Sequence, residues 1–241
     1  MGSADDRDRE LRRAVFGGDG QRLINLLSQE PWGDRLQLAG DGLLVALAQG
    51  VKRAPGLAQQ CAEGLRERAW AGDEDLADQL EAALGERPTP MLRPLAVDLD
   101  ELASVLEGDP AYGGGRIDLR TGEVWPQAAI EYAREQQEDD VETEDEDPDR
   151  WLPVWCKGSR DAYRDMEHFI EALEDEDRAD RLSIAITGRG AFRRFKDVLS
   201  RWPDELERWH TFSDERQRGR ARAWLAAAGY VPRQHEPHLP T

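Results

Sequence analysis

Along most of the chain, apolar residues recur at the spacing of an α-helix, and only one stretch alternates as a β-strand does. Two apolar stripes repeat the same intervals, so we expect two helices that pack together with their aromatic side chains in the core. The stripes are Tyr163, Met166, Phe169, Ile170 and Leu173, and then Phe192, Phe195, Val198, Leu199 and Trp202. The pattern predicts a mainly helical α+β protein, with an N-terminal helical-hairpin module and a C-terminal domain whose helices pack on a small antiparallel sheet.

The helical-hairpin module, residues 1–86, contains two similar segments, Leu11–Asp19 and Leu65–Asp73. Each begins with Leu-Arg, has a large aromatic residue five positions later and ends with Gly-Asp. The glycine can end one helix in the left-handed conformation, and the aspartate can cap the next helix by accepting hydrogen bonds from its first amides. Such a stack either binds a protein partner or covers the C-terminal core, and the sequence leaves both interpretations open.

A proline-rich segment separates the two parts. Arg87–Pro94 has three prolines in eight residues, which excludes regular structure and predicts a semi-rigid linker. We expect the second domain to cover residues 95–231 and its last helix to stop at Gly229. Residues 232–241 are expected to form a disordered tail.

The strand signal lies in the second domain. Arg116–Arg120 and Glu123–Pro126 alternate apolar and polar residues on either side of Thr121-Gly122, and they predict a β-hairpin. Trp151–Cys156 predicts a third strand, which Pro153 places at an edge of the sheet. The sheet is therefore expected to be small and antiparallel.

An acidic run, residues 135–149, has ten acidic residues in fifteen positions. Self-repulsion predicts a solvated insertion there, and the alternatives are a nucleic-acid mimic or a metal-collecting segment. The run contributes strongly to a net charge of -18. Nucleic-acid binding is unlikely for such a chain, because it needs a basic surface, whereas basic protein partners are favoured.

The predictions about localisation and catalysis rest on the absence of targeting, membrane-spanning and catalytic motifs. No secretory signal and no apolar run long enough to span a membrane occur, and Cys61 and Cys156 do not form a disulfide or metal pattern. We expect a cytoplasmic protein without membrane attachment, metal or cofactor. Cys156 with His168 or His210 is a possible nucleophile and base, but no nucleophile signature surrounds it, so an inert thiol is favoured and no catalytic residue is assigned.

A glycine-flanked turn after the stretch Leu182–Ile186 is the candidate anion-binding site. The candidate residues are Gly188, Arg189, Gly190, Arg193, Arg194 and Lys196. The free amides and positive dipole end of a helix that starts here favour an anion. In the competing structural interpretation, Phe192 and Phe195 anchor the helix in the core and the arginines pair with neighbouring acids. Those acids are Glu171, Glu174, Asp175, Asp177 and Asp180.

Several motifs occur in a distinctive order: Ile117–Val124, Met166–Ile170, Gly188–Asp197, and the pairs Trp209 with Phe212 and Trp224 with Leu225. In this order they resemble the bacterial uncharacterised protein family numbered 0158, over roughly residues 95–230. The resemblance implies a bacterial, cytosolic protein with no assigned activity. It does not extend to the helical-hairpin module.

The leading hypothesis is a non-enzymatic interaction or regulatory protein that uses the helical stack for a protein partner. The alternative is an enzyme that acts on a phosphorylated substrate through the Gly188–Lys196 turn, with Arg189, Arg193 and Lys196 as phosphate clamps. An enzyme gathers its cations and a carboxylate in a concave pocket, whereas an interaction protein spreads them on a flat or self-paired surface.

Overall fold

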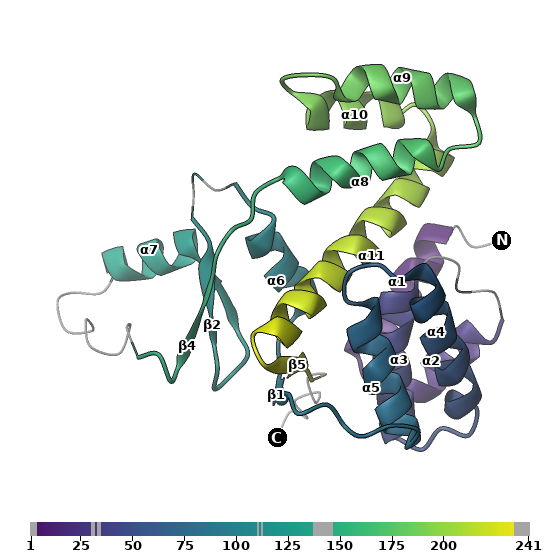
Figure 1. Ribbon diagram of the computed structural model, residues 1–241, viewed down its shortest axis with the longest axis vertical. Coiled ribbons are helices and arrows are strands. Elements are labelled where there is room, and N and C mark those ends of the chain that lie inside the picture. The colour runs from purple at the N-terminus through teal and green to yellow at the C-terminus, as the bar shows by residue number, and fades with distance from the viewer. Residues whose placement is uncertain are drawn as a thin grey trace.

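The structure is a computed structural model that describes residues 4–29, 32, 35–109, 111, 113–136 and 147–233, without the side chains of residues 4–8 and 16. Over these residues the chain forms eleven α-helices and five β-strands (Figure 1). The helices are α1 (Ala4–Phe16), α2 (Gly20–Leu27), α3 (Leu36–Ala48), α4 (Ala54–Arg68), α5 (Asp73–Leu84), α6 (Leu99–Leu106), α7 (Gln127–Gln136), α8 (Arg160–Glu171), α9 (Glu176–Ile186), α10 (Ala191–Leu199) and α11 (Pro203–Ala227). The strands are β1 (Arg93–Leu95), β2 (Gly115–Asp118), β3 (Val124–Pro126), β4 (Trp151–Val154) and β5 (Tyr230–Pro232). The mainly helical α+β class is confirmed.

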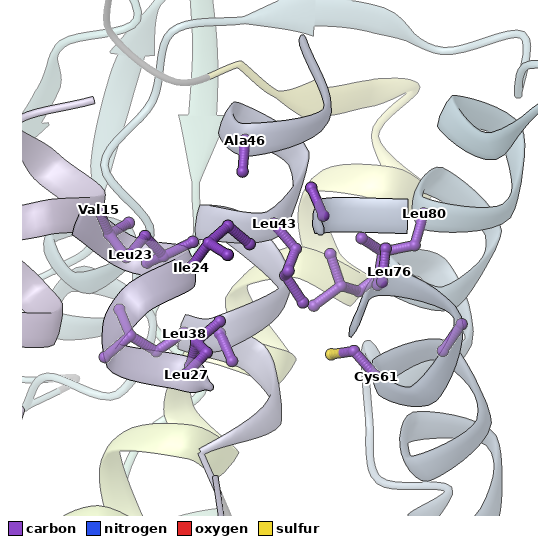
Figure 2. Close-up of a cluster of buried hydrophobic side chains, with 14 of the residues drawn as sticks. Val15, Leu23, Ile24, Leu27, Leu38, Leu43, Ala46, Cys61, Leu76 and Leu80 are labelled. Carbon is purple, nitrogen blue, oxygen red and sulfur yellow. The ribbon is translucent and has the colours of Figure 1, made fainter. Parts of the chain in front are cut away.

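Helices α1 to α5 form the N-terminal module around one apolar core. Helix α3 lies at its centre, and Leu43 extends between Ile24 of α2 and Leu76 of α5 (Figure 2). In the first Gly-Asp segment, Gly18 is left-handed and the Asp19 carboxylate accepts a hydrogen bond from the amide of Arg22 at 2.9 Å. This cap is the one that the sequence predicts.

The second Gly-Asp segment differs from the prediction at its aspartate. Gly72 is left-handed as expected, but Asp73 is the first residue of α5 and does not cap the amides that follow it. Its buried carboxylate instead accepts hydrogen bonds from the amide of Trp70 and from the side chains of Arg68 and Gln37. The expected cap is wrong here because a buried carboxylate needs strong donors on every side.

The predicted linker ends in a strand, so the expectation of no regular structure is wrong at Arg93 and Pro94. β1 pairs in parallel with β5, and the amide of Arg93 donates to the carbonyl of Gly229 at 3.0 Å. Pro94 is tolerated because β1 has a single neighbour and therefore needs few amide donors. The predicted tail likewise begins inside β5, at Pro232. These two strands join the start of the second domain to its end.

The antiparallel sheet has the strand order β3-β2-β4. The predicted hairpin and third strand are confirmed, and β4, which contains Pro153, lies at an edge. The hairpin loop is longer than expected, because Leu119 and Arg120 belong to the turn instead of the strand. Helix α7, which the sequence did not predict, follows β3. Most of the acidic run, residues 137–146, lies outside the described residues, as does the predicted tail from residue 234.

Helices α8, α9 and α10 form an apolar cluster of their own with the first half of α11. The two predicted stripes pack together, and the rings of Phe169 and Phe195 meet edge to face at 6.3 Å. Phe192 departs from the prediction, because its side chain is 36% exposed instead of buried in the core. The buried residues of α10 are Ala191, Phe195 and Leu199. Helix α11 is a single helix of 25 residues that contacts α3, α5, α6 and α8 and crosses the molecule diagonally (Figure 1).

Candidate functional site

The predicted anion-binding turn lies at the free end of a helical hairpin, which we name the α9–α10 arm (residues 176–199). Figure 1 shows the arm at one end of the molecule, beyond α8, with the turn between α9 and α10 projecting from it. Gly188 and Gly190 both have positive φ, at +79° and +78°, which glycine adopts without strain. The glycines therefore shape the turn as the sequence predicts.

Arg194 points back into the turn. Its Nε atom donates to the carbonyl of Ala185 at 2.9 Å, and an Nη atom donates to the carbonyl of Thr187 at 2.7 Å. The other Nη atom bonds the carbonyl of Arg189. The last carbonyls of a helix have no partner within the helix, so a guanidinium at this end of α9 satisfies them and complements the negative end of the dipole. Arg194 thus holds the arm together.

The other cations of the turn extend into solvent. Arg193 is 89% exposed and lies 3.8 Å from Asp197 one helical turn away, while Arg189 and Lys196 form no ion pair with a described residue. The predicted pairing of the arginines with acids of α8 and α9 is therefore wrong. Asp175 instead pairs with Arg178 at 3.2 Å, and the acceptors of Arg194 are backbone carbonyls.

A buried ionic network joins α11 to the N-terminal module. Arg222 has no exposed surface, and it donates to Gln37 Oε1 at 2.8 Å and to Asp41 Oδ1 at 2.6 Å. Arg218 donates to the other oxygen of Asp41 at 2.9 Å and to Asp100 of α6 at 2.6 Å. Burial raises the pKa of Asp41, but the two guanidinium groups together lower it below its ordinary value. The pair of arginines therefore keeps this carboxylate ionised in the interior.

Glu215, one turn before Arg218, caps α3 from a distant part of the chain. Its two carboxylate oxygens accept hydrogen bonds from the amides of Gln37 and Leu38, at 2.7 and 3.0 Å. These are free amides in the first turn of α3, whose own N-cap residue provides no side-chain cap. Arg68 then bridges Glu215 and Asp73. Burial raises the pKa of Glu215 by more than Arg68 and the two amides lower it.

A close backbone contact accompanies this network. A Cβ atom on Gly219 would lie 2.2 Å from the carbonyl oxygen of Ala71, and one on Gly72 would lie 2.1 Å from the carbonyl oxygen of Gly219. Only glycine fits at these two positions, because the obstructing atoms belong to the backbone. The loop between α4 and α5 therefore rests directly on α11.

A cleft of about 950 Å³ lies where the module meets the second domain, and we name it the junction cleft. Its apolar walls come from the C-terminal half of α3 and from the segment between β1 and α6. The wall residues are Leu44, Val45, Ala48, Ala96, Val97 and Leu99. The Asp41–Arg218 pair also lies among the lining residues, as do Pro232 of β5 and Arg233.

Three carboxylates also line the junction cleft: Asp98, Glu101 and Glu123. Asp98 caps α6 by accepting hydrogen bonds from the amides of Asp100 and Glu101. Burial raises the pKa of Glu101, and the negative charges of Asp98 and Glu123 raise it further. None of the three forms an ion pair with a cation in the described part of the chain. Four acidic and two basic residues line the cleft, which therefore combines apolar walls with an excess of negative charge.

Sequence comparison assigns the C-terminal part of the chain to a family. The profile described as "Uncharacterised protein family (UPF0158)" matches residues 92–238, which is more than half of the chain. The chain belongs to this family. A relative named UPF0158 protein PA5073, from Pseudomonas aeruginosa, is 30% identical over 136 residues, which cover 56% of this chain and 84% of that protein. No solved structure matches the chain significantly.

The UPF0158 match contains α11 but not the module that α11 binds. Glu215, Arg218 and Arg222 lie within the match, whereas their partners Gln37, Asp41 and Arg68 precede it. The sequence reasoning missed all of these residues. The available signal was the spacing of three charged residues along one face of α11, but such a face is solvated in most helices.

The catalytic candidates are not brought together. The thiol of Cys156 donates to the carbonyl of Gly108 at 2.9 Å, while His168 lines a separate hollow of about 210 Å³ beside Trp70. Cys61 is buried, which raises the pKa of its thiol. Both cysteines are free. Within the described ranges, no three metal-binding side chains lie close enough to share an ion, and no helix has the length and apolarity to cross a bilayer.

Proposed function

We propose that this UPF0158 protein is a non-enzymatic interaction protein, and that the junction cleft binds a segment of a protein partner that carries both basic and apolar side chains. The observation that carries the proposal is the lining of the cleft. Apolar residues of α3 and of the segment from β1 to the start of α6 line it, and Asp98, Glu101 and Glu123 have no cationic partner among the described residues.

The chemistry of the partner follows from this lining. Apolar side chains of a bound segment gain about 25 cal/mol for each Å² removed from water. Arginine or lysine side chains on the same segment would pair with Asp98, Glu101 and Glu123, and the bound segment would shield these pairs from solvent, so that salt screens them less than pairs on an open surface. A cation beside Glu101 also lowers the pKa that burial has raised. Binding is therefore expected to weaken as the pH falls through the pKa of Glu101.

Fluorescence anisotropy with labelled peptides tests the proposal. The first peptide combines arginine and leucine, the second replaces its arginines with glutamate, and the third replaces its leucines with serine. We expect only the first to bind the full chain. The double substitution Glu101→Lys/Glu123→Lys should weaken this binding by about tenfold or more. A matched control, Glu63→Lys/Glu67→Lys on the exposed face of α4, changes the net charge equally.

Two outcomes would contradict the proposal. If the cleft variant and the α4 control bind the first peptide equally, the binding reflects only the net charge of the protein. If none of the peptides binds the native chain, the cleft does not recognise basic and apolar segments. Circular dichroism and urea unfolding of both variants establish that they are folded.

The alternative, an enzyme that acts on a phosphorylated substrate through the Gly188–Lys196 turn, stays a prediction. Arg194 is engaged with backbone carbonyls, so Arg189, Arg193 and Lys196 remain as the cations for such a substrate. A test must spare Arg194. The double substitution Arg189→Glu/Arg193→Glu is therefore the informative variant for anion binding.

A further inference from the structure

We propose that the partner segment for the junction cleft is the α9–α10 arm of a second copy of this chain, so that two copies associate head to tail. This inference rests on the proposed function and names the partner of the same cleft. The arm has the combination of basic and apolar side chains that the cleft lining requires. It lies too far from the cleft of its own chain to bind there, so it can bind only the cleft of another molecule.

The arm region carries a charge opposite to the rest of the protein. Residues 176–199 include six cationic residues and four acidic residues, which gives a net charge of +2. The whole chain has a net charge of -18, so the other residues together carry -20. A basic surface of this kind attracts the acidic regions of a neighbouring copy.

Apolar side chains lie among these cations at the end of the arm. Ile184 is 74% exposed and Phe192 is 36% exposed, and they flank the turn from the α9 side and the α10 side. Both belong to helices whose remaining large apolar residues are buried in the core of the arm. Exposed apolar residues surrounded by charged ones are typical of a protein-binding surface.

The shape of the turn suits insertion into a cleft. No heavy atom lies within 4 Å of the position that a Cβ atom on Gly188 would occupy, so this residue leaves open space on the outside of the turn. Arg194 fixes the turn through the carbonyls of Ala185 and Thr187, which lowers the entropy that docking would cost. The turn is therefore accessible at Gly188 and held in one conformation by Arg194.

The arm and the cleft lie at opposite ends of the molecule. Figure 1 is drawn with the longest axis vertical, and it shows α9 and α10 at the top and the β1–β5 pair, which borders the cleft, at the bottom. An arm cannot reach the cleft of its own chain in this fold. Docking between copies is consequently heterologous, with one surface of each copy facing a different surface of the other.

Salt concentration has a definite effect on this contact. Two copies with a net charge of -18 repel each other at long range, but at physiological ionic strength the Debye length is about 8 Å and the repulsion is screened. The contact between the arm and the cleft is shorter than this distance. We therefore expect association at physiological salt that becomes weaker at higher salt.

Charge reversal of each surface tests the proposal by analytical ultracentrifugation. The arm variant is Arg189→Glu/Arg193→Glu, and the cleft variant is Glu101→Arg/Glu123→Arg. The native chain should self-associate as its concentration rises from micromolar to millimolar. Each variant alone should associate at least about tenfold more weakly, because its arm and its cleft carry the same sign of charge.

A mixture of the two variants provides the decisive readout. The basic arm of the cleft variant fits the acidic cleft of the arm variant, so an equimolar mixture should associate again. The control Glu63→Arg/Glu67→Arg should behave as the native chain does. Association that persists in both single variants, or a mixture that stays monomeric, would overturn the proposal, since either result places the contact elsewhere.

The outcome also separates this proposal from the proposed function. A native chain that stays monomeric at every concentration but binds the arginine–leucine peptide loses the second copy as its partner and keeps the function of the cleft. A chain that neither self-associates nor binds the peptide loses both. Urea unfolding of each variant shows that the loss of association is not a loss of folding.

Discussion

Two regions of this molecule are rich in arginine, and they use it in opposite ways. On α11, Arg216, Arg218, Arg220 and Arg222 all pair with carboxylates at 2.5 to 2.8 Å and are largely buried. At the end of the α9–α10 arm, Arg193 is 89% exposed and its nearest carboxylate is 3.8 Å away. The difference lies in the surroundings, because α11 crosses a junction between two packed parts and the arm projects from the fold.

The comparison shows where the stability of the junction comes from. Buried charges are costly to remove from water, so each one must be matched by partners with good geometry. The α11 arginines find these partners in residues that are far away in sequence, such as Asp41 and Asp100. The exposed arginines of the arm remain hydrated and are available to a ligand or another molecule.

Replacing a buried arginine of α11 should have the largest effect. Arg222→Met leaves Asp41 with Arg218 alone and removes the donor to Gln37. We expect the free energy of unfolding to fall by about 3 kcal/mol, the lower end for a broken buried pair, since Arg218 still compensates Asp41. Urea unfolding measures the change. Arg193→Met is the control and should have no measurable effect on the free energy of unfolding. If both variants lose a similar amount of stability, the arginines of α11 and of the arm do not differ in their contribution to folding.

The next effect concerns the backbone contact that brings α11 to the module. Gly219→Ala places a methyl group 2.2 Å from the carbonyl oxygen of Ala71. We expect a loss of about 1–3 kcal/mol from overpacking. Gly56→Ala in α4 has open space around it and should instead stabilise the protein, by up to about 1 kcal/mol, because alanine favours a helix. If the Gly219→Ala protein is as stable as the Gly56→Ala protein, the backbone around Ala71 can move to accommodate the methyl group at little cost.

Sequence reasoning found the elements of this fold but not the way they meet. Local signals predicted the cap at Asp19, the hairpin at β2 and β3, and the packing of Phe169 on Phe195. The parallel pairing of β1 with β5 was missed, because each strand has three residues and the partners are more than a hundred residues apart. Short strands with distant partners leave no periodic pattern in a sequence.

The candidate site shows the same limit. The glycines of the arm turn were recognisable because their spacing is local, and their positive φ angles agree with the prediction. The partners of the arginines in this turn were not recognisable from the sequence. Arg194 donates to backbone carbonyls, and no pattern of side chains reveals such a contact. The junction cleft was missed entirely. Its lining comes from α3, the start of α6, the hairpin turn and β5, which only the tertiary structure brings together.

Within the arm, the two neighbouring arginines should differ in a smaller way. Arg194→Ala removes the hydrogen bonds to the carbonyls of Ala185 and Thr187, and we expect a loss of about 1 kcal/mol and faster hydrogen exchange around the end of α9. Arg193→Ala should leave both quantities unchanged. Hydrogen exchange followed by mass spectrometry resolves this segment. Equal exchange in the two variants would show that Arg194 does not hold the turn.

The smallest effect is a change with pH, which arises in the junction network at Glu215. Its pKa in the folded state is raised above the ordinary 4.5, because burial outweighs the contributions of Arg68 and the amides of Gln37 and Leu38. The folded state therefore holds this proton more tightly than the unfolded state does. The resulting stabilisation is complete below the unfolded pKa and is lost as the pH rises through the folded pKa.

Glu215→Gln isolates this contribution, since glutamine does not titrate. The stability of the native chain relative to the variant should decline as the pH rises from about 4.5 towards neutrality, and urea unfolding at a series of pH values measures it. Asp41, whose pKa is lowered, titrates in both proteins and cancels in the difference. A difference that grows with pH would mean that Arg68 and the two amides outweigh burial. In that case the ionised form of Glu215 would cap α3 more strongly than the protonated form, and the hydrogen bonds at the junction would more than offset the cost of burying its charge.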